Sequence, residues 1–201
     1  MTTVEHSERL ASHRDKAVEL FASKGFAQVS MRELATCMGL APGSLYYHYP
    51  SKRHLLLDIL EEFYEELLAT LARVDGRCGE SMGAVIRAHV KLHQELPMHF
   101  RIALRDSGCL SEEQQQCIEA LRAQYEARLV DLLDNNPRQQ SWQVSVHFGC
   151  IIGSLLGIVY AWFAAQRMDE PDSVRFMEVA LVGAIERLLA QPGNGLSQTI
   201  D

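Results

Sequence analysis

The chain has 201 residues, 47% of them hydrophobic, and a formal net charge of −7 at pH 7. This length is enough to bury the core of one domain or two. The five cysteines form no Cys-x-x-Cys pair, which excludes a disulfide framework and a zinc ribbon and predicts buried free thiols in a cytoplasmic protein. A redox pair of Cys109 and Cys117 stays an alternative.

The acidic charge is unevenly distributed. Residues 1–60 hold seven Lys and Arg and six Asp and Glu, a net charge of +1, whereas residues 61–201 hold twelve and twenty, a net charge of −8. The N-terminal part is therefore the only part whose charge suits a polyanionic partner.

Residues 30–53 read as two short helices joined by a glycine turn, followed by the start of a third. Ser30 and Glu33 have the spacing of a capping box. Gly39 is expected to end the first helix in the left-handed conformation, and Pro42 suits the opening turn of the second. This pattern predicts a helix-turn-helix.

The second of these helices is shorter than two turns and carries Ser44, Tyr46, Tyr47 and His48. A helix this short and polar adds little to a core, so we interpret it as a probe for the DNA major groove. Core packing of Tyr46 and Tyr47, and simple solvent exposure of His48, remain the alternatives.

Residues 13–57 resemble the N-terminal domain of TetR-type bacterial transcriptional repressors along their whole length. The similar blocks follow one another in the family's order: residues 17–21, 24–26, 30–35, 39–49 and 51–57. The resemblance implies a phosphate contact for Lys52, phosphate or packing contacts for Tyr46, Tyr47 and His48, and base contacts for Arg32, Pro42, Gly43 and Ser44. Ala41 departs from the family's Ser or Thr cap and leaves this helix without a side-chain cap.

The rest of the chain also reads as helices. We predict helices over about residues 51–73, 82–95, 98–106, 111–135, 140–167 and 171–191, and expect Ser111 with Gln114 to start the helix over 111–135. The helix over 51–73 carries one apolar face, formed by Leu56, Leu60, Phe63, Leu67 and Leu71. The fold class is all-α, and the resemblance implies about nine helices. It also implies a DNA-binding domain over residues 1–52, a ligand-binding and dimerisation domain over 53–193 with the fourth helix as connector, and a disordered tail over 194–201.

Residues 144–165 contain no charged residue, and Gly149, Gly153 and Gly157 recur at four-residue spacing. Such a segment reads either as a membrane span or as a helix that packs closely against another. Polar residues interrupt the run and no basic cluster flanks it, so we predict a dimer interface rather than a membrane segment. In the resembled family the last two helices build this interface, which adds Val182, Ile185 and Leu189.

Polar residues lie on the apolar helices between residues 86 and 160. We expect an inducer cavity bordered by His89, His93, Arg101, Arg105, Tyr125 and His147. Residues 86–133 also resemble, faintly, regulatory domains that sense acyl-CoA thioesters. His89 and His93 have the i, i+4 spacing of metal ligands, but the sequence offers no third ligand, so we predict no metal and no cofactor. Exposure of the pair to solvent stays open.

No nucleophile, acid–base pair or phosphate-binding loop is present, so we do not expect an enzyme. The sequence predicts a homodimeric transcriptional regulator, most simply a repressor, that binds a palindromic operator. A small-molecule inducer, acyl-type or otherwise amphipathic, would release it. The alternative is a helical membrane-associated or ligand-carrier protein with a degenerate DNA-binding head.

Overall fold

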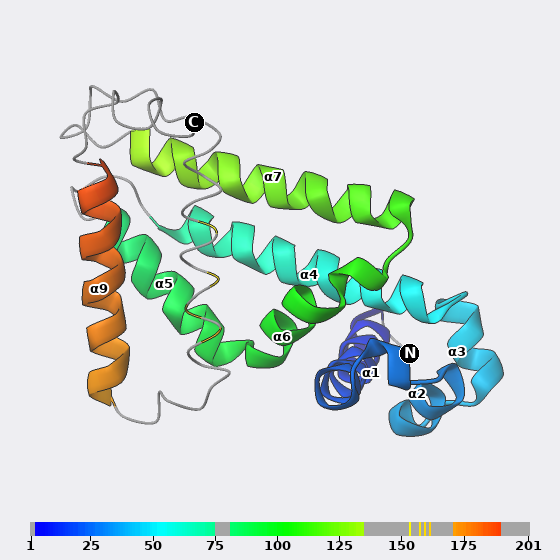
Figure 1. Cartoon of the computed structure of the whole chain (residues 1–201). Helices are drawn as coiled ribbons and strands as arrows, with labels where there is room; N and C mark the ends of the chain where they lie inside the picture. Colours follow the sequence, from blue (N-terminus) through cyan, green and yellow to red (C-terminus); the bar gives the residue numbers. More distant parts are fainter. Residues whose placement is uncertain are drawn as a thin grey trace, which may run out of the picture. The chain divides into compact units, whose positions relative to one another are not determined.

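The computed structural model describes residues 3–74, 81–134 and 171–189, together with residues 153, 157, 159 and 161. Within these residues the chain is helical and has no strand, which confirms the predicted all-α fold. The elements of Figure 1 are α1 (Thr3–Lys24), η1 (Phe26–Gln28), α2 (Met31–Met38), α3 (Pro42–His48), α4 (Lys52–Arg73), α5 (Ser81–Glu95), α6 (Pro97–Asp106), η2 (Ser107–Cys109), α7 (Glu112–Asp134) and α9 (Pro171–Leu189).

The predicted helices over 51–73, 82–95 and 98–106 match α4, α5 and α6 closely. The helix predicted over 140–167 falls almost entirely outside the described residues, although residues 153, 157, 159 and 161 within it are helical. The predicted tail, 194–201, also lies outside the described part of the chain. Among the described helices, none is long and apolar enough to cross a membrane.

The chain divides into two compact units. Unit 1 comprises Met1–Glu66 and Leu96–Arg122, and unit 2 comprises Leu67–Glu95 and Ala123–Asp201. Helices α4 and α7 therefore each begin in unit 1 and continue into unit 2. Unit 1 holds α6 in addition to the predicted DNA-binding segment, whereas the functional boundary predicted after residue 52 stays a prediction.

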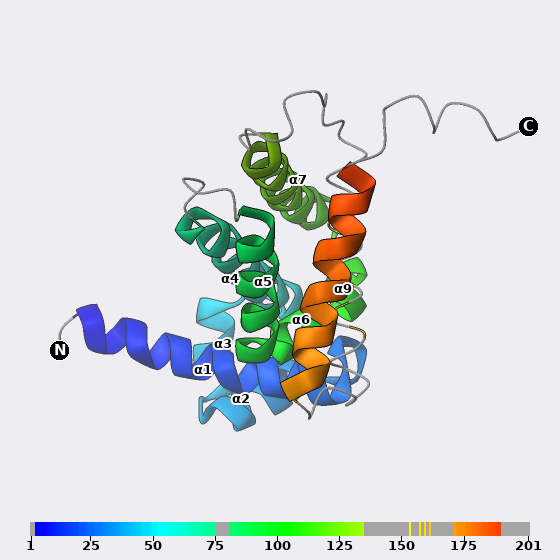
Figure 2. The ribbon, with the colours of Figure 1, turned by 90° about the vertical axis from the view of Figure 1, so that its left-hand side faces the viewer.

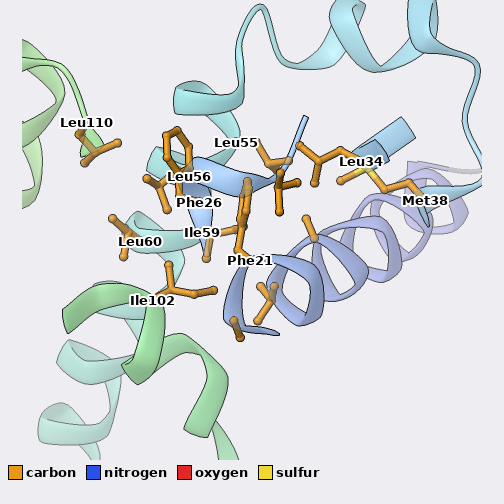
Figure 3. Packing of buried hydrophobic residues seen from close by; sticks show 14 of the residues in the cluster. Phe21, Phe26, Leu34, Met38, Leu55, Leu56, Ile59, Leu60, Ile102 and Leu110 are labelled. Atoms are coloured by element: carbon orange, nitrogen blue, oxygen red, sulfur yellow. The ribbon is translucent and has the colours of Figure 1, made fainter. Parts of the chain in front are cut away.

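The apolar core of unit 1 connects α1, α2, α4 and α6 (Figure 3). Phe21 and Phe26 lie at its centre, with ring centroids 5.5 Å apart. Leu34 from α2 and Ile102 from α6 are fully buried in the same cluster. Because burying one such side chain contributes about 1.5–3 kcal/mol, α6 shares in the stability of the segment that carries the helix-turn-helix.

The ends of α2 follow the local sequence signals. The Ser30 hydroxyl accepts a hydrogen bond from the Glu33 backbone N–H, as predicted. The Glu33 carboxylate pairs with Lys24, and its pKa is lowered first by that hydrogen bond and in smaller part by the Ser30 backbone N–H. Gly39 has φ +72°, and the N–H groups of Gly39 and Leu40 bond to the carbonyls of Thr36 and Ala35. The predicted left-handed helix end is thus confirmed.

Two further predictions about helices are confirmed. All five residues of the apolar face predicted on α4 are buried: Leu56, Leu60, Phe63, Leu67 and Leu71. Ser111 and Gln114 cap α7 reciprocally, with the Gln114 N–H donating to the Ser111 hydroxyl and the Ser111 N–H donating to the Gln114 side chain. In unit 2, α5 packs along α9, and Figure 2 shows the two helices side by side.

Candidate DNA-binding surface and buried histidine cluster

Helix α3 exposes almost its entire surface. Leu45 is its only buried side chain, whereas Tyr46 is 52% and Tyr47 is 85% exposed. Core packing of the two tyrosines, the alternative left by the sequence, is therefore wrong. Ala41 makes no side-chain cap, as predicted, and its carbonyl accepts the N–H groups of Ser44 and Leu45.

The other residues predicted to meet DNA share this exposure. Pro42, Ser44 and His48 of α3 are exposed, as is Arg32 of α2. Gly43 is also exposed, with no atom within 4 Å of a Cβ built on it. The His48 ring packs edge-on against Tyr47, with centroids 5.3 Å apart. Their roles on DNA stay predictions, and the structure supplies the accessible surface that such roles need.

The Lys52 ammonium is bonded to backbone carbonyls of its own chain. Its ammonium donates to the carbonyl oxygens of Phe26 and Val29, both at 2.7 Å, and lies 4.2 Å from the centroid of the Phe26 ring. Two of its three N–H donors are thus bonded to the turn between α1 and α2. Lys52 fastens the first turn of α4 to this turn, and its predicted phosphate contact stays a prediction.

A polar network that the sequence did not indicate joins α1 to α4. The Tyr49 hydroxyl donates to the Asp58 carboxylate at 2.8 Å. Arg14 bonds to Asp58 at 3.4 Å and to Glu62 at 2.9 Å. Burial, followed by the hydrogen bond to Asp58, raises the pKa of Tyr49, so its hydroxyl stays protonated as a donor. Asp58 and Glu62 recur at i, i+4 on α4, which is the only local sequence signal of this network.

Arg105 also has a role that the sequence did not predict. Its guanidinium donates to the carbonyls of Phe21 and Ala22 in the last turns of α1, and to the Asp106 carboxylate at 3.0 and 2.8 Å. Asp106 is only 5% exposed. A cation is favoured at a helix C-terminus, so Arg105 caps α1 from α6. The pocket role predicted for Arg105 finds no support in this geometry, and Arg101 on the same helix is exposed.

Three other predicted pocket residues meet inside unit 2. Nε2 of His89 and Nε2 of His93 are 3.1 Å apart, and the Tyr125 hydroxyl lies 3.2 Å from Nδ1 of His89. The three side chains are 5%, 1% and 6% exposed, so exposure of the pair to solvent is excluded. Burial lowers the pKa of His89 to about 3, which keeps the imidazole neutral at pH 7. His147 lies outside the described residues.

The predicted dimer residues are described in part. Gly153 and Gly157 are partly exposed, whereas Val159, two residues after Gly157, is buried. Among the described residues, a Cβ at Gly157 would meet nothing within 4 Å, and one at Gly153 would meet only Glu126 at 3.8 Å. Val182 is partly exposed. Gly149 and the side chains of Ile185 and Leu189 lie outside the description.

Two apolar residues of α9 extend this surface. Phe176 and Val179 are each 66% exposed, whereas Met177 and Leu181 on the same helix are buried. Phe176 and Val179 lie about two turns and one turn before Val182, and all three are apolar residues of the last helix in the sequence.

The thiols correct one prediction. Cys37 and Cys117 are exposed and Cys109 is partly exposed, so the expectation of buried cysteines is wrong for these three. Among the described residues, no group of three or more His, Cys, Asp or Glu side chains is arranged to hold a metal ion.

The sequence matches two family models. One, described as bacterial regulatory proteins of the tetR family, covers residues 14–59. The other, described as a tetracyclin repressor-like C-terminal domain, covers residues 75–175. Among curated relatives, the HTH-type transcriptional repressor KstR2 of Mycolicibacterium smegmatis is 29% identical over 97 residues, 41% of this chain and 47% of that protein. The chain spans less than half the length of the first curated relatives that it matches.

Solved structures agree with these models. The TetR-family regulator PfmR from Thermus thermophilus is 28% identical, with a TM-score of 0.72 over 87% of this chain and 97% of that chain. AibR, solved in complex with isovaleryl coenzyme A and operator DNA, is 20% identical, with a TM-score of 0.70 over 88% of this chain and 97% of that one, and shows the fold alone. Because the two family models span both the helix-turn-helix and the helices after it, the chain belongs to the TetR family of bacterial transcriptional regulators.

Proposed function

We propose that the protein is a ligand-responsive repressor that binds a palindromic operator as a homodimer and is released by a small-molecule inducer. The observation that carries this proposal is α3, which packs through one buried residue, Leu45, and turns its polar and aromatic side chains outward. A major groove accepts a helix presented in this way. The relatives KstR2, a repressor, and AibR, solved with operator DNA, support the same function.

The exposed residues divide by the type of contact that they offer. Tyr46, Tyr47 and His48 offer hydroxyl and ring N–H groups to phosphates, which fixes the register without reading sequence. Arg32 offers a fork that suits guanine, and Ser44 at the front of α3 offers a small hydroxyl to a base edge. Lys52 contributes its remaining N–H donor and its charge.

A homodimer would bring two such helices into successive major grooves, about 34–36 Å apart. The partly exposed Gly153 and Gly157 and the exposed Phe176 and Val179 support a dimer face in unit 2, because small residues allow close approach and large apolar residues need cover. The similarity to AibR and KstR2 does not test which surface of this chain forms the dimer.

For the inducer we keep His89, His93 and Tyr125 as polar groups of the site. An acyl-type or other amphipathic molecule fits a mostly apolar interior with a few polar groups. The isovaleryl coenzyme A in the AibR complex supports an acyl compound. Helix α4 continues from unit 1 into unit 2 and offers a covalent path between the sites. Releasing DNA 100-fold requires about 2.7 kcal/mol of coupling.

The test begins with operator selection from a random DNA pool, followed by fluorescence anisotropy at several salt concentrations. We expect a near-palindrome and an affinity that falls steeply with salt. Lys52→Ala should weaken binding to all sequences about equally and flatten the salt slope, whereas Arg32→Ala and Ser44→Ala should change the preference among operator variants. Lys91→Ala, an exposed lysine on α5, is the matched control.

Non-palindromic, salt-insensitive binding would favour the ligand-carrier alternative. For the inducer, thermal-shift screening of acyl-CoAs, free fatty acids and aromatic drugs is followed by operator-release assays. If another class stabilises the protein and releases DNA while acyl thioesters do neither, the acyl proposal is wrong and the repressor proposal stands.

A further inference from the structure

We propose that His89 and His93 bind a first-row transition metal ion of the zinc type through their Nε2 atoms, with Tyr125 holding His89 from the second sphere. The two histidines lie one turn apart on α5 and both are buried. Their Nε2 atoms face one another at 3.1 Å. The same three side chains are the polar groups proposed above for the inducer site, but binding of an ion is tested without inducer or DNA and so separately from the regulator function.

The separation of the two nitrogens suits a shared ion. Zinc binds histidine nitrogen at about 2.0–2.1 Å, so two such ligands at octahedral to tetrahedral angles lie about 2.9–3.4 Å apart. The observed 3.1 Å falls inside this range, so the separation of the two nitrogens needs no change for one ion to bind both. The ring centroids are 4.8 Å apart and the ring planes are inclined by 67°, which is an angled approach of the two imidazoles.

The contact with Tyr125 is compatible with the tautomer that an ion needs. A metal-binding histidine commonly donates its second ring N–H to a nearby acceptor, which leaves the other nitrogen with its lone pair for the ion. Tyr125 Oη lies 3.2 Å from Nδ1 of His89 and is an acceptor of this kind. With Nδ1–H donating to Tyr125, Nε2 of His89 presents a lone pair toward His93.

The donor set indicates the class of ion. Imidazole suits zinc, copper, iron and nickel, whereas magnesium and calcium prefer oxygen ligands. No third His, Cys, Asp or Glu joins the pair among the described residues. The two imidazoles therefore supply part of the coordination shell, and water or a donor atom of a bound small molecule would complete it, as in open zinc sites.

The competing arrangement is a metal-free hydrogen bond, in which one Nε2 carries a proton and donates to the other. The two arrangements differ in what they predict on addition of metal. A hydrogen-bonded pair alone is indifferent to zinc, whereas a ligand pair gives saturable binding of one ion per chain.

The experiment titrates the EDTA-treated full chain with Co²⁺, followed by visible absorption, and with Zn²⁺, followed by calorimetry. We expect one site per chain, and at least a tenfold loss of affinity in His89→Gln and in His93→Gln. Tyr125→Phe keeps the ring and removes the acceptor, so a loss of about 10–100-fold is expected. His99→Gln, on α6 in unit 1, is the matched control and should bind like the parent chain.

Circular dichroism and thermal unfolding establish that each variant is folded. If a histidine variant does not fold, Tyr125→Phe still tests the proposal. The proposal is overturned if no ion binds, if His89→Gln and His93→Gln bind as well as the control, or if intense thiolate-to-cobalt absorption places the ion on cysteines. Operator binding is measured in parallel on the metal-free chain, so the failure of one proposal leaves the other visible.

Discussion

The two compact units of the chain differ in where the side chains of their candidate sites lie. Unit 1 presents Tyr46, Tyr47 and Arg32 to solvent, and ties its helices together with side chains bonded to backbone carbonyls. Unit 2 encloses His89, His93 and Tyr125 and leaves apolar residues of α9 exposed. A surface made for a hydrated polyanion needs polar groups outside, whereas a site for a small molecule or ion needs them inside a dry interior.

The largest effect on stability is expected from removing the Arg105 contacts between α6 and α1. Arg105→Ala removes the Arg105 hydrogen bonds to the buried Asp106 carboxylate and to the Phe21 and Ala22 carbonyls, although the Phe21 carbonyl keeps the Gly25 N–H. Because the Arg105 side chain is 40% exposed, water softens the loss, and we expect the free energy of unfolding to fall by about 2–3 kcal/mol. Urea unfolding measures this.

The control for Arg105→Ala is Arg101→Ala on the same helix. Arg101 is exposed, so its removal should change the free energy of unfolding by less than about 0.5 kcal/mol. Equal effects of the two substitutions would mean that the Arg105 contacts add nothing to unit 1.

The apolar surface of unit 2 provides the second test. Among the described residues, a Cβ at Gly157 meets no atom within 4 Å, so in Gly157→Leu this position has room for a side chain at its base. In a dimer that uses this face the extra side chain should cost about 1–3 kcal/mol or more, and monomer should appear in sedimentation. Gly153→Leu should act in the same direction.

Gly183→Leu is a comparison on α9, where a Cβ likewise meets nothing within 4 Å. If Gly157→Leu and Gly153→Leu both leave the dimer intact, the glycine row faces something other than the two-fold axis. The apolar surface of unit 2 would then not be the dimer face.

Acid provides a test of unit 1 at the contact of α6 with α1. Burial lowers the pKa of His99; Asp15 opposes this shift and Arg14 adds to it. Since the pKa in the folded chain lies below that in the unfolded chain, the stability from neutral His99 is present above about pH 6.5 and is lost as the pH falls below it.

The free energy of unfolding should therefore fall between pH 7 and pH 5, with a contribution from His99 of less than about 1.4 kcal/mol per pH unit. His99→Gln should make this slope shallower in urea titrations at stepped pH. A slope that does not change on substitution would show that His99 keeps its ordinary pKa in the folded chain.

The smallest expected change in stability concerns the N-terminus of α3. Ala41 provides no side-chain cap, so Ala41→Ser should add a hydroxyl acceptor for an N–H of the first turn and stabilise the chain by about 0.5–1 kcal/mol. Ala41→Val is the control, because valine supplies no hydroxyl and is as poor an N-cap as alanine. Thermal unfolding of both variants checks this, and equal melting temperatures would contradict it.

Local signals in the sequence predicted the helices of this protein well. Ser30, Gly39 and the pair Ser111 and Gln114 act within five residues of their own positions, so their roles are visible in the order of the chain. The apolar face of α4 was predictable for the same reason, since a repeat of 3.6 residues needs no partner to be recognised.

The long-range polar contacts were not predictable in this way. Arg105 bonds to α1 carbonyls more than eighty residues away, whereas its position in the sequence suggested a pocket role. Lys52 was predicted on a DNA phosphate, yet its ammonium also bonds to Phe26 and Val29. For His89 and His93 the spacing was visible, but the approach of Tyr125 depends on how α7 packs against α5. Backbone carbonyls have no sequence signature, so side chains that bond to them are hidden until the fold is known.

The single anchor of α3 has a consequence for how this regulator can change over generations. Leu45 carries the packing of the helix, while its neighbours at 42, 43, 44, 46, 47 and 48 are exposed. Substitutions at exposed positions usually change stability by no more than about 0.5 kcal/mol. With α3 as the proposed reader of the operator, mutation can therefore change the preferred DNA sequence while the stability of the fold stays almost the same, and within this helix Leu45 alone is held by its packing.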